Sequence, residues 1–153
     1  MKCYTNYKEN VLNTDRAESL YYHLKYNIEW EDGIRSKKGY TRKAKPLNFG
    51  DIPEVDQAIV DALKQLSNTN YAILGIYLNN YENGEMWTPN HSHKGTHQLV
   101  VSLGQTRRLD VGNKHYNMTN GSGIIFGSSI HGVPKDGTTE GRISIATFMV
   151  PLN

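Results

Sequence analysis

Three histidines are the residues of this chain whose type and spacing best suit chemistry. His91 and His93 are separated by one residue, and His131 follows in a segment rich in Gly and Ser. Because side chains alternate along an extended strand, residues two apart point to the same side of a sheet. A third imidazole from a later strand could complete a metal site, and three ligands leave positions open for oxygen, water or a chelating cosubstrate. Exposed histidines without a role have the same spacing in polar loops, so the spacing alone leaves both interpretations open.

The composition limits the classes of protein to which the chain can belong. Its 153 residues suffice for one domain with its own core, and its single cysteine, Cys3, excludes a disulfide framework and a multi-cysteine zinc site. We therefore expect a protein of a reducing, cytoplasmic compartment. The longest apolar runs, 72–74 and 99–101, are far shorter than the ~20 residues that span a bilayer, and no charged-then-apolar leader precedes them. The sequence predicts no membrane association.

Positive charge is concentrated in one short stretch. The formal net charge of +2 is too small to predict a polyanionic partner by itself. Six basic residues nevertheless fall within eleven residues that contain no acid, with Tyr40 among them: Arg35, Lys37, Lys38, Arg42, Lys43 and Lys45. Such a patch attracts phosphates through the release of counterions, although a solvated surface loop can have the same composition.

Two helices are expected before the strands that carry the histidines. In the first, Asp15 and Glu18 resemble a capping box, and apolar residues recur at intervals of four: Leu20, Leu24 and Ile28. The second begins at Pro53, a residue favoured in a first helical turn, and has one apolar stripe: Val55, Ile59, Leu63 and Leu66. Both stripes need a sheet to cover. Residues 31–49 are polar, basic and rich in Gly and Ser, and we interpret them as an exposed loop or short hairpin that acts as a lid.

The remainder of the chain is predicted to form strands. Short segments rich in β-branched and aromatic residues, with turn-forming residues between them, lie at 71–81, 98–103, 107–111, 114–118, 123–126 and 142–150. Six strands after two helices indicate the α+β class. We see no internal repeat or linker, so residues 1–153 are expected to form a single domain, with helices and lid at 12–68 and a β-barrel core at 69–153.

Several of these segments resemble the AlkB-like iron(II)/2-oxoglutarate dioxygenases. That family has, in order, an Asn-x-Tyr-x-x-Gly strand and turn, a His-x-Asp pair, and a Ser-Leu-Gly strand end followed by Arg. This chain has Leu-Asn-Asn-Tyr-Glu-Asn-Gly at 78–84, His-Ser-His at 91–93, and Val-Ser-Leu-Gly at 101–104 before Arg107 and Arg108. Three further segments resemble the Gly-rich strand leading to the distal His, the closing strand with its cosubstrate Arg, and the nucleotide-recognition lid: 121–131, 142–148 and 41–51.

The resemblance, which covers about residues 28–149, implies a fold and two cofactors. The fold would be a double-stranded β-helix, that is, a jelly-roll or cupin-like barrel, with the two N-terminal helices packed on one face. Iron(II) would be bound by the catalytic residues His91, His93 and His131. The cosubstrate 2-oxoglutarate would be bound by three side chains: Asn79, Tyr81 and Arg142. A guanidinium suits this role because it matches a carboxylate with two parallel hydrogen bonds.

The resemblance also implies an activity and a partner. The expected reaction is the hydroxylation or oxidative demethylation of a modified base in nucleic acid, as in DNA repair. A base must leave its stack to be reached, and aromatic and basic side chains stabilise the extruded base. The candidate substrate contacts are Trp30, Tyr40, Arg42, Lys43 and Trp87, each of which could equally serve ordinary packing.

This chain departs from the family pattern at two positions with chemical consequences. His93 stands where the family has a carboxylate ligand, and three neutral ligands leave the charge of the metal uncompensated. The family's second cosubstrate Arg is expected about six residues after Arg142, where this chain has Phe148 and Met149. The extra residue Ala146 is expected to mark a bulge in the closing strand.

Two other functions remain open on the sequence. Gly84, His91, His93, His97 and Gly104 have the spacing of a cupin metal motif, and three-His cupins oxidise small molecules without 2-oxoglutarate. The chain could also be a catalytically impaired barrel that only binds nucleic acid or a metabolite. Arg142 and the pair formed by Asn79 and Tyr81 favour the dioxygenase, since a cupin does not need them.

Overall fold

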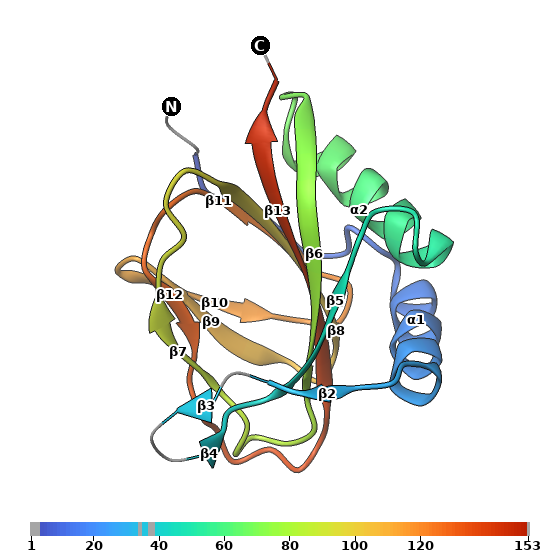
Figure 1. Cartoon of the computed structure of the whole chain (residues 1–153), viewed down its shortest axis with the longest axis vertical. Helices are drawn as coiled ribbons and strands as arrows, with labels where there is room; N and C mark the ends of the chain where they lie inside the picture. The colour runs from blue at the N-terminus through green and yellow to red at the C-terminus, as the bar shows by residue number, and fades with distance from the viewer. Residues whose placement is uncertain (1–3, 34, 37–38, 153) are drawn as a thin grey trace.

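Two main antiparallel β-sheets face each other, and two helices cover the outer side of the larger sheet (Figure 1). The computed structural model describes residues 4–33, 35–36 and 39–152. The helices are α1 (Thr14–Asn27) and α2 (Pro53–Leu66). The strands are β1 (Asn6–Lys8), β2 (Glu31–Asp32), β3 (Arg35–Ser36), β4 (Gly39–Tyr40), β5 (Lys43–Leu47), β6 (Tyr71–Tyr81), β7 (Thr88–His91), β8 (His97–Gly104), β9 (Arg107–Val111), β10 (Lys114–Met118), β11 (Gly123–Phe126), β12 (His131–Val133) and β13 (Arg142–Pro151).

Each of the two main sheets contains neighbouring strands that are far apart in the sequence. The larger sheet has the order β1-β11-β8-β13-β6-β5-β2, and the smaller has the order β10-β9-β12-β7. A further hairpin pairs β3 with β4. This arrangement is consistent with a jelly-roll, the fold that the resemblance implies. No helix in the described part of the chain is long and apolar enough to cross a membrane.

Alternation along the three central strands of the larger sheet creates both the core and the site. One face of β6, β8 and β13 packs against the helices through apolar side chains: Ile76, Leu78, Leu99, Val101, Leu103, Ile143, Ile145 and Met149. The intervening residues point between the two sheets, and many of them are polar or aromatic: Asn79, Tyr81, Gln98, Arg142, Ser144 and Phe148. Since side chains in a strand alternate between faces, the same segments supply a hydrophobic core on one side and a functional cavity on the other.

The helices occur where the sequence predicts them, with one difference at the first N-terminus. Helix α1 is capped by Asn13, whose side chain accepts a hydrogen bond from the Arg16 amide at 2.8 Å. The expected capping box starting at Asp15 is therefore wrong, because the N-cap is Asn13 and Asp15 already lies in the first turn of the helix. Helix α2 starts at Pro53, as predicted, and the proline occupies the first turn, where an amide donor is not needed.

Residues 31–49 are more ordered than the predicted loop or hairpin. Strand β5 joins the larger sheet beside β6, with Ala44 opposite Asn79, and β2 extends the same edge. The interpretation of this whole segment as an exposed loop is thus wrong for Lys43–Leu47. Lys37 and Lys38 of the basic stretch lie outside the described residues, as do the side chains of Arg35 and Tyr40.

The closing strand β13 is regular at Ala146, which pairs with Tyr77 and Val100. The irregularity lies instead between Phe148 and Met149, in the pairing with β6. The bulge predicted at Ala146 is therefore wrong, because the extra residue is Leu74 of β6, between the partners of Phe148 and Met149. Because the register is regular up to Phe148, the residues 142, 144, 146 and 148 all face the space between the sheets.

Candidate active site

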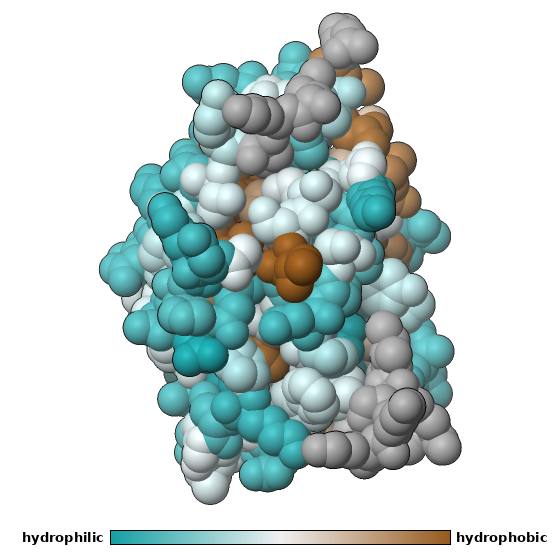
Figure 2. Space-filling view, turned by 90° about the vertical axis from the view of Figure 1, so that its left-hand side faces the viewer, coloured by the Kyte–Doolittle hydropathy of each residue, from teal (hydrophilic) through white to brown (hydrophobic). Residues whose placement is uncertain are grey.

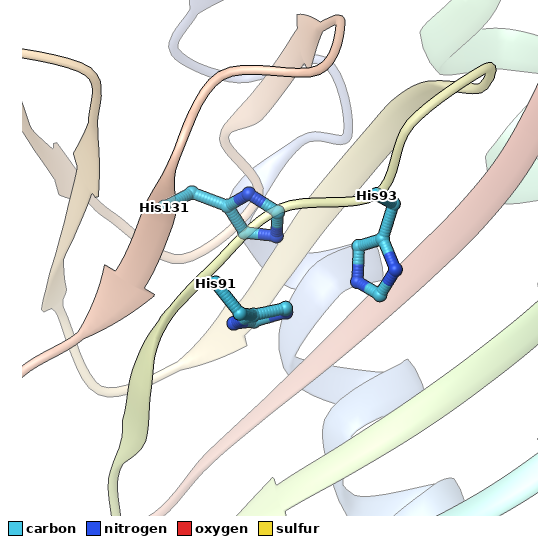
Figure 3. A group of neighbouring side chains, drawn as sticks. All are labelled: His91, His93 and His131. Atoms are coloured by element: carbon cyan, nitrogen blue, oxygen red, sulfur yellow. The ribbon is translucent and has the colours of Figure 1, made fainter.

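Three imidazole rings converge between the two sheets (Figure 3). His91 ends β7 and His131 begins β12, and the two residues are directly paired across these antiparallel strands. His93 lies two residues beyond the end of β7, so strand alternation alone does not place it; the following loop does. One potential ligand atom of each ring lies within 4.8 Å of the others. The structure thus assembles a cluster of three nitrogen donors.

A glycine beside His131 allows β12 to approach β7 closely. A Cβ atom on Gly132 would lie 2.9 Å from the Thr88 carbonyl oxygen and would also collide with the Asn90 side chain. Any side chain at this position would push the two strands apart and separate His131 from His91. Gly132 is therefore a local requirement of the histidine pair.

Backbone carbonyl groups fix two of the rings in the tautomer that a metal requires. His91 Nδ1 lies 2.7 Å from the Pro89 carbonyl oxygen, and His131 Nδ1 lies 2.9 Å from that of Ser129. Because a carbonyl oxygen can only accept, both Nδ1 atoms donate, and each neutral ring presents the lone pair of Nε2. His93 forms no hydrogen bond with the residues that the structure describes. Since imidazole nitrogens bind metals at about 2.0–2.1 Å, His93 would rotate towards the two fixed rings.

The surroundings of His93 and His131 favour the neutral forms of these two rings. Burial lowers the pKa of His131 to about 4, and the nearby imidazoles act in the same direction. Burial also lowers the pKa of His93, with smaller contributions from His91 and from the charge of Arg42. A metal ligand must be unprotonated, so the protein itself maintains the ligand-competent state.

A cavity of about 410 Å³ surrounds the cluster. Its walls come from β6, β8 and β13 on one side and from β7, β9 and β12 on the other. Besides the histidines, the polar side chains that line it are Arg42, Asn79, Tyr81, Thr88, Gln98, Arg142 and Ser144. None of the described lining residues is an Asp or a Glu. The cavity is therefore cationic and suits an anionic ligand.

Arg142 is the buried charge of this cavity. Its side chain is 1% exposed, its Nε donates to Ser102 Oγ at 2.7 Å, and its guanidinium carbon lies 5.3 Å from the centre of the Tyr81 ring. Nη1 and Nη2 are buried and have no hydrogen-bond partner among the described residues. Burial lowers the pKa of Arg142 to about 10. Two unsatisfied, parallel donors on a buried cation indicate a site for a carboxylate.

The side chains expected to assist Arg142 also lie in the cavity. Tyr81 and Thr88 share a hydrogen bond of 2.6 Å between their hydroxyl groups. Asn79 donates from Nδ2 to Ser144 Oγ at 3.3 Å and accepts at Oδ1 from Nε of Arg42 at 2.9 Å. The expected cosubstrate residues Asn79, Tyr81 and Arg142 are thus brought together in the cavity that contains the three histidines.

The expected substrate contacts are not gathered in one place. Arg42 lines the cavity, whereas Lys43 pairs with Glu82 at 3.3 Å and is not among the lining residues. Trp30 packs against the core under the helices, and its indole N–H lies 3.4 Å from the Lys25 carbonyl oxygen. Trp87 lines a separate shallow groove, where the Lys135 ammonium lies 5.9 Å from its ring centre.

Two residues of the resemblance have structural positions outside the cavity. Arg107 donates to the carbonyl groups of Asn83, Met86 and Pro134, so its guanidinium holds neighbouring turns together. His97, the fourth polar position of the cupin motif, lies 2.8 Å from the Tyr71 hydroxyl and is not part of the histidine cluster. The cupin arrangement would need His97 beside the other rings, and the structure does not place it there.

Gln98 is a cavity residue that the sequence interpretation missed. It is 2% exposed, and its buried Nε2 has no hydrogen-bond partner among the described residues. The sequence does contain a signal, because Gln98 is an amide in a mainly apolar strand. It lies on the same face of that strand as Val100 and Ser102, and Leu99 lies on the other face. Like the free Nη atoms of Arg142, this donor can bind a ligand.

Comparisons with known proteins give a fold but no sequence family. No family model matches the chain, and no curated protein matches it in sequence. A prolyl-4-hydroxylase from Pseudomonas putida is 13% identical, with a TM-score of 0.63 over 97% of this chain and 93% of that one. HygX from Streptomyces hygroscopicus, solved with nickel and 2-oxoglutarate bound, is 11% identical, with a TM-score of 0.71 over 96% and 82%. The α-ketoglutarate-dependent epimerase SnoN of nogalamycin biosynthesis is 12% identical, with a TM-score of 0.73 over 95% and 78%.

These similarities show that the chain has the fold of non-heme 2-oxoglutarate-dependent oxygenases. They include enzymes named for a peptide residue and for an antibiotic pathway, and so support the fold of the superfamily rather than the AlkB-like branch. Membership of that branch stays a prediction of the sequence.

Proposed function

We propose that this protein is an iron(II)- and 2-oxoglutarate-dependent oxygenase. The observation that carries the proposal is the buried guanidinium of Arg142, whose two partnerless Nη groups line the same cavity as three metal-competent histidines. A cupin-type enzyme that binds only a metal has no use for an unpaired buried cation, and such a charge is costly to bury without a partner. A dicarboxylate cosubstrate supplies that partner.

The residues present fit both groups. His91, His93 and His131 would hold the metal, and the two Nη atoms of Arg142 would bind the distal carboxylate of 2-oxoglutarate, with Tyr81 alongside. When bound, iron(II) and 2-oxoglutarate would together activate dioxygen, which is the oxidant for a substrate C–H bond, while 2-oxoglutarate is itself oxidised to succinate and carbon dioxide. The backbone acceptors of His91 and His131 keep Nε2 of each ring unprotonated and directed at the metal. Val100, Leu109, Val133 and Phe148 form an apolar part of the cavity lining.

The proposal is tested by titrating the protein with Fe(II) and 2-oxoglutarate without oxygen and then admitting air. We expect one Fe(II) and one 2-oxoglutarate bound per chain and succinate formed after aeration. Loss of a residue that only hydrogen-bonds to a metal ligand typically lowers metal affinity by about 10- to 100-fold. Because His131→Ala removes a ligand itself, we expect a loss of metal affinity at least as large. His115→Ala, which removes an exposed histidine elsewhere, is the matched control. Failure of the wild type to bind 2-oxoglutarate would contradict the proposal.

As the substrate we propose a modified base in nucleic acid, as the AlkB-like resemblance implies. A shallow groove adjoins the cavity and shares Thr88 and Pro89 with it. Its lining contains the aromatic side chain of Trp87 and two basic side chains, Lys135 and Arg108, the second of which pairs with Asp110 of the same groove. The face turned towards the viewer in Figure 2 is mainly hydrophilic, with an apolar spot near its centre and an apolar band along its upper right edge. Such a surface suits a charged polymer better than a broad apolar partner.

Charge reversal beside the cavity is expected to weaken the binding of a single-stranded oligonucleotide. The double variant Lys43→Glu, Lys135→Glu reverses two positive charges, one next to Arg42 on β5 and one in the groove. The slope of log affinity against log salt should decrease by roughly 0.7 for each phosphate that the variant no longer neutralises. Lys8→Glu with Lys64→Glu, on β1 and α2, changes the net charge equally and serves as control. If the two double variants had the same slope of log affinity against log salt, the proposal that the substrate is a nucleic acid would be wrong.

A further inference from the structure

We propose that Arg42 is a second carboxylate-binding side chain of the cavity, and that it binds the carboxylate next to the keto group of 2-oxoglutarate while Arg142 binds the distal one. This inference rests on the proposed function and assigns to Arg42 a role different from the substrate contact expected from the sequence. It concerns a residue just before β5, in a segment that precedes the histidines and the closing strand.

Two hydrogen bonds hold the Arg42 guanidinium at the cavity. Its Nε donates to Asn79 Oδ1 at 2.9 Å, and its Nη1 donates to Thr41 Oγ1 at 3.1 Å. Arg42 forms no ion pair with any residue that the structure describes. By contrast, its neighbour Lys43 forms an ion pair with Glu82 and does not line the cavity. The guanidinium of Arg42 is therefore oriented by the protein and has donor capacity left for a ligand.

The pairing of the larger sheet puts Arg42 and Arg142 on either side of β6. Lys43 pairs with Asn80, so Arg42 lies level with Tyr81, and Tyr81 pairs with Arg142. From there the Arg42 side chain reaches along β6 to Asn79, which pairs with Ser144. Neighbouring strands lie about 4.8 Å apart, so the backbones of β5 and β13, with β6 between them, are roughly 10 Å apart. Because the Arg42 side chain extends to Asn79 on β6, the two guanidinium groups can hold the two ends of one five-carbon dicarboxylate at the same cavity wall.

Phe148 explains why a second guanidinium must come from elsewhere. The resemblance expects an Arg near the position of Phe148, but the phenyl ring there lies 4.9 Å from the centre of the His93 ring and offers no donor to a carboxylate. Arg42 reaches the cavity from the other side of β6, by way of Asn79. The positive group that the closing strand lacks is in this way supplied by the N-terminal part of the chain.

Charge balance supports the same assignment. The described lining contains two guanidinium groups and three imidazoles but no acid, and a divalent ion would add two further positive charges. With His93 in place of a carboxylate, no ligand from the protein compensates the metal. Buried charges are retained only when they are paired. A dianion bound between Arg142, the metal and Arg42 would provide that compensation.

Truncated ligands separate the two ends of the cosubstrate. Levulinate keeps the keto group and the distal carboxylate of 2-oxoglutarate, whereas 2-oxovalerate keeps the keto acid and lacks the distal carboxylate. Binding of each compound to the Ni(II)-loaded protein would be measured by calorimetry, after the nickel content of every variant has been determined. For Arg42→Ala and Arg42→Gln we expect a loss of about 10- to 100-fold in affinity for 2-oxoglutarate and 2-oxovalerate, the value of a hydrogen-bonded charge. Levulinate affinity should change less than about threefold, within the scatter of such measurements.

Lys45→Ala, which removes a cation of β5 that pairs with Glu31 and does not line the cavity, is the matched control and should leave all three affinities unchanged. The double variant Arg42→Ala, Phe148→Arg should recover part of the affinity, because it returns a guanidinium to the closing strand. Equal losses for levulinate and 2-oxoglutarate, or no loss in either Arg42 variant, would overturn the inference and leave the proposed function standing. Absence of 2-oxoglutarate binding by the wild type would overturn the proposed function instead.

Discussion

Replacement of Arg142 by methionine is expected to abolish 2-oxoglutarate binding and at the same time to stabilise the ligand-free protein. Arg142 is fully buried, burial lowers its pKa to about 10, and two of its nitrogens lack partners among the described residues. Removing a buried, uncompensated charge in favour of an apolar side chain of similar length raises the free energy of unfolding by on the order of 1–3 kcal/mol. Removing the partner of a buried carboxylate weakens binding by at least about 100-fold.

Two measurements check this prediction. Thermal unfolding of metal-free Arg142→Met should show a higher midpoint than the wild type, and calorimetry on the Ni(II)-loaded variant should show no 2-oxoglutarate binding with unchanged nickel content. Arg142→Lys is the informative control, because it keeps the charge but loses the forked donors; it should bind weakly and gain no stability. A destabilised methionine variant would indicate that Arg142 serves the fold rather than a ligand.

Opposite effects on stability and binding distinguish Arg142 from Arg107, the other fully buried arginine. Arg107 also lies over the Tyr81 ring, with its guanidinium carbon 5.3 Å from the ring centre. Its nitrogens, however, donate to three backbone carbonyl groups, and it faces Asp136 at 3.2 Å. Both guanidinium groups lie near the Tyr81 ring, but only Arg142 lines the cavity, with its two Nη groups without partners among the described residues.

The parts of the site that the sequence predicted are those governed by local periodicity or by a motif. Alternation along β6 predicts that Asn79 and Tyr81 share one face, and alternation along β13 predicts the same for Arg142 and Phe148. In the structure all four side chains line the cavity. The helices were predictable for the same reason, since their apolar stripes follow a helical period. Which face of a strand a side chain occupies follows from its position along that strand, so it can be predicted without knowing which strands pair.

The parts that the sequence did not predict depend on pairing between distant segments. Strands β7 and β12 are too short to give a periodic signal, and β7 contains Pro89, which an edge strand tolerates. Their pairing nevertheless places His91 opposite His131. The position of Arg42 in the cavity likewise requires β5 to lie beside β6, and a polar, basic segment gives no indication of that.

The identity of the third ligand is expected to control which metal the protein prefers. His93→Asp replaces a neutral nitrogen donor with a charged oxygen donor beside the metal. Oxygen donors favour Fe(II) and Mn(II), whereas three imidazoles favour the later metals of the Irving–Williams series. We expect the Mn(II) affinity relative to Ni(II) to increase by at least about tenfold, the effect of roughly one favourable charge contact. Succinate formation with Fe(II) should increase with it, because the carboxylate compensates metal charge.

A comparison with His93→Asn separates charge from shape. Asparagine has nearly the same size as aspartate and lacks the charge, so a charge effect predicts a selectivity shift in His93→Asp alone. His93 is suited to this substitution because it is partly exposed, lies beyond the end of β7 and forms no hydrogen bond with the described residues, so the fold does not depend on its ring. If His93→Asp and His93→Asn gave the same metal preference, charge at this position would not be what tunes the centre, and His91 and His131 would determine the metal largely by themselves.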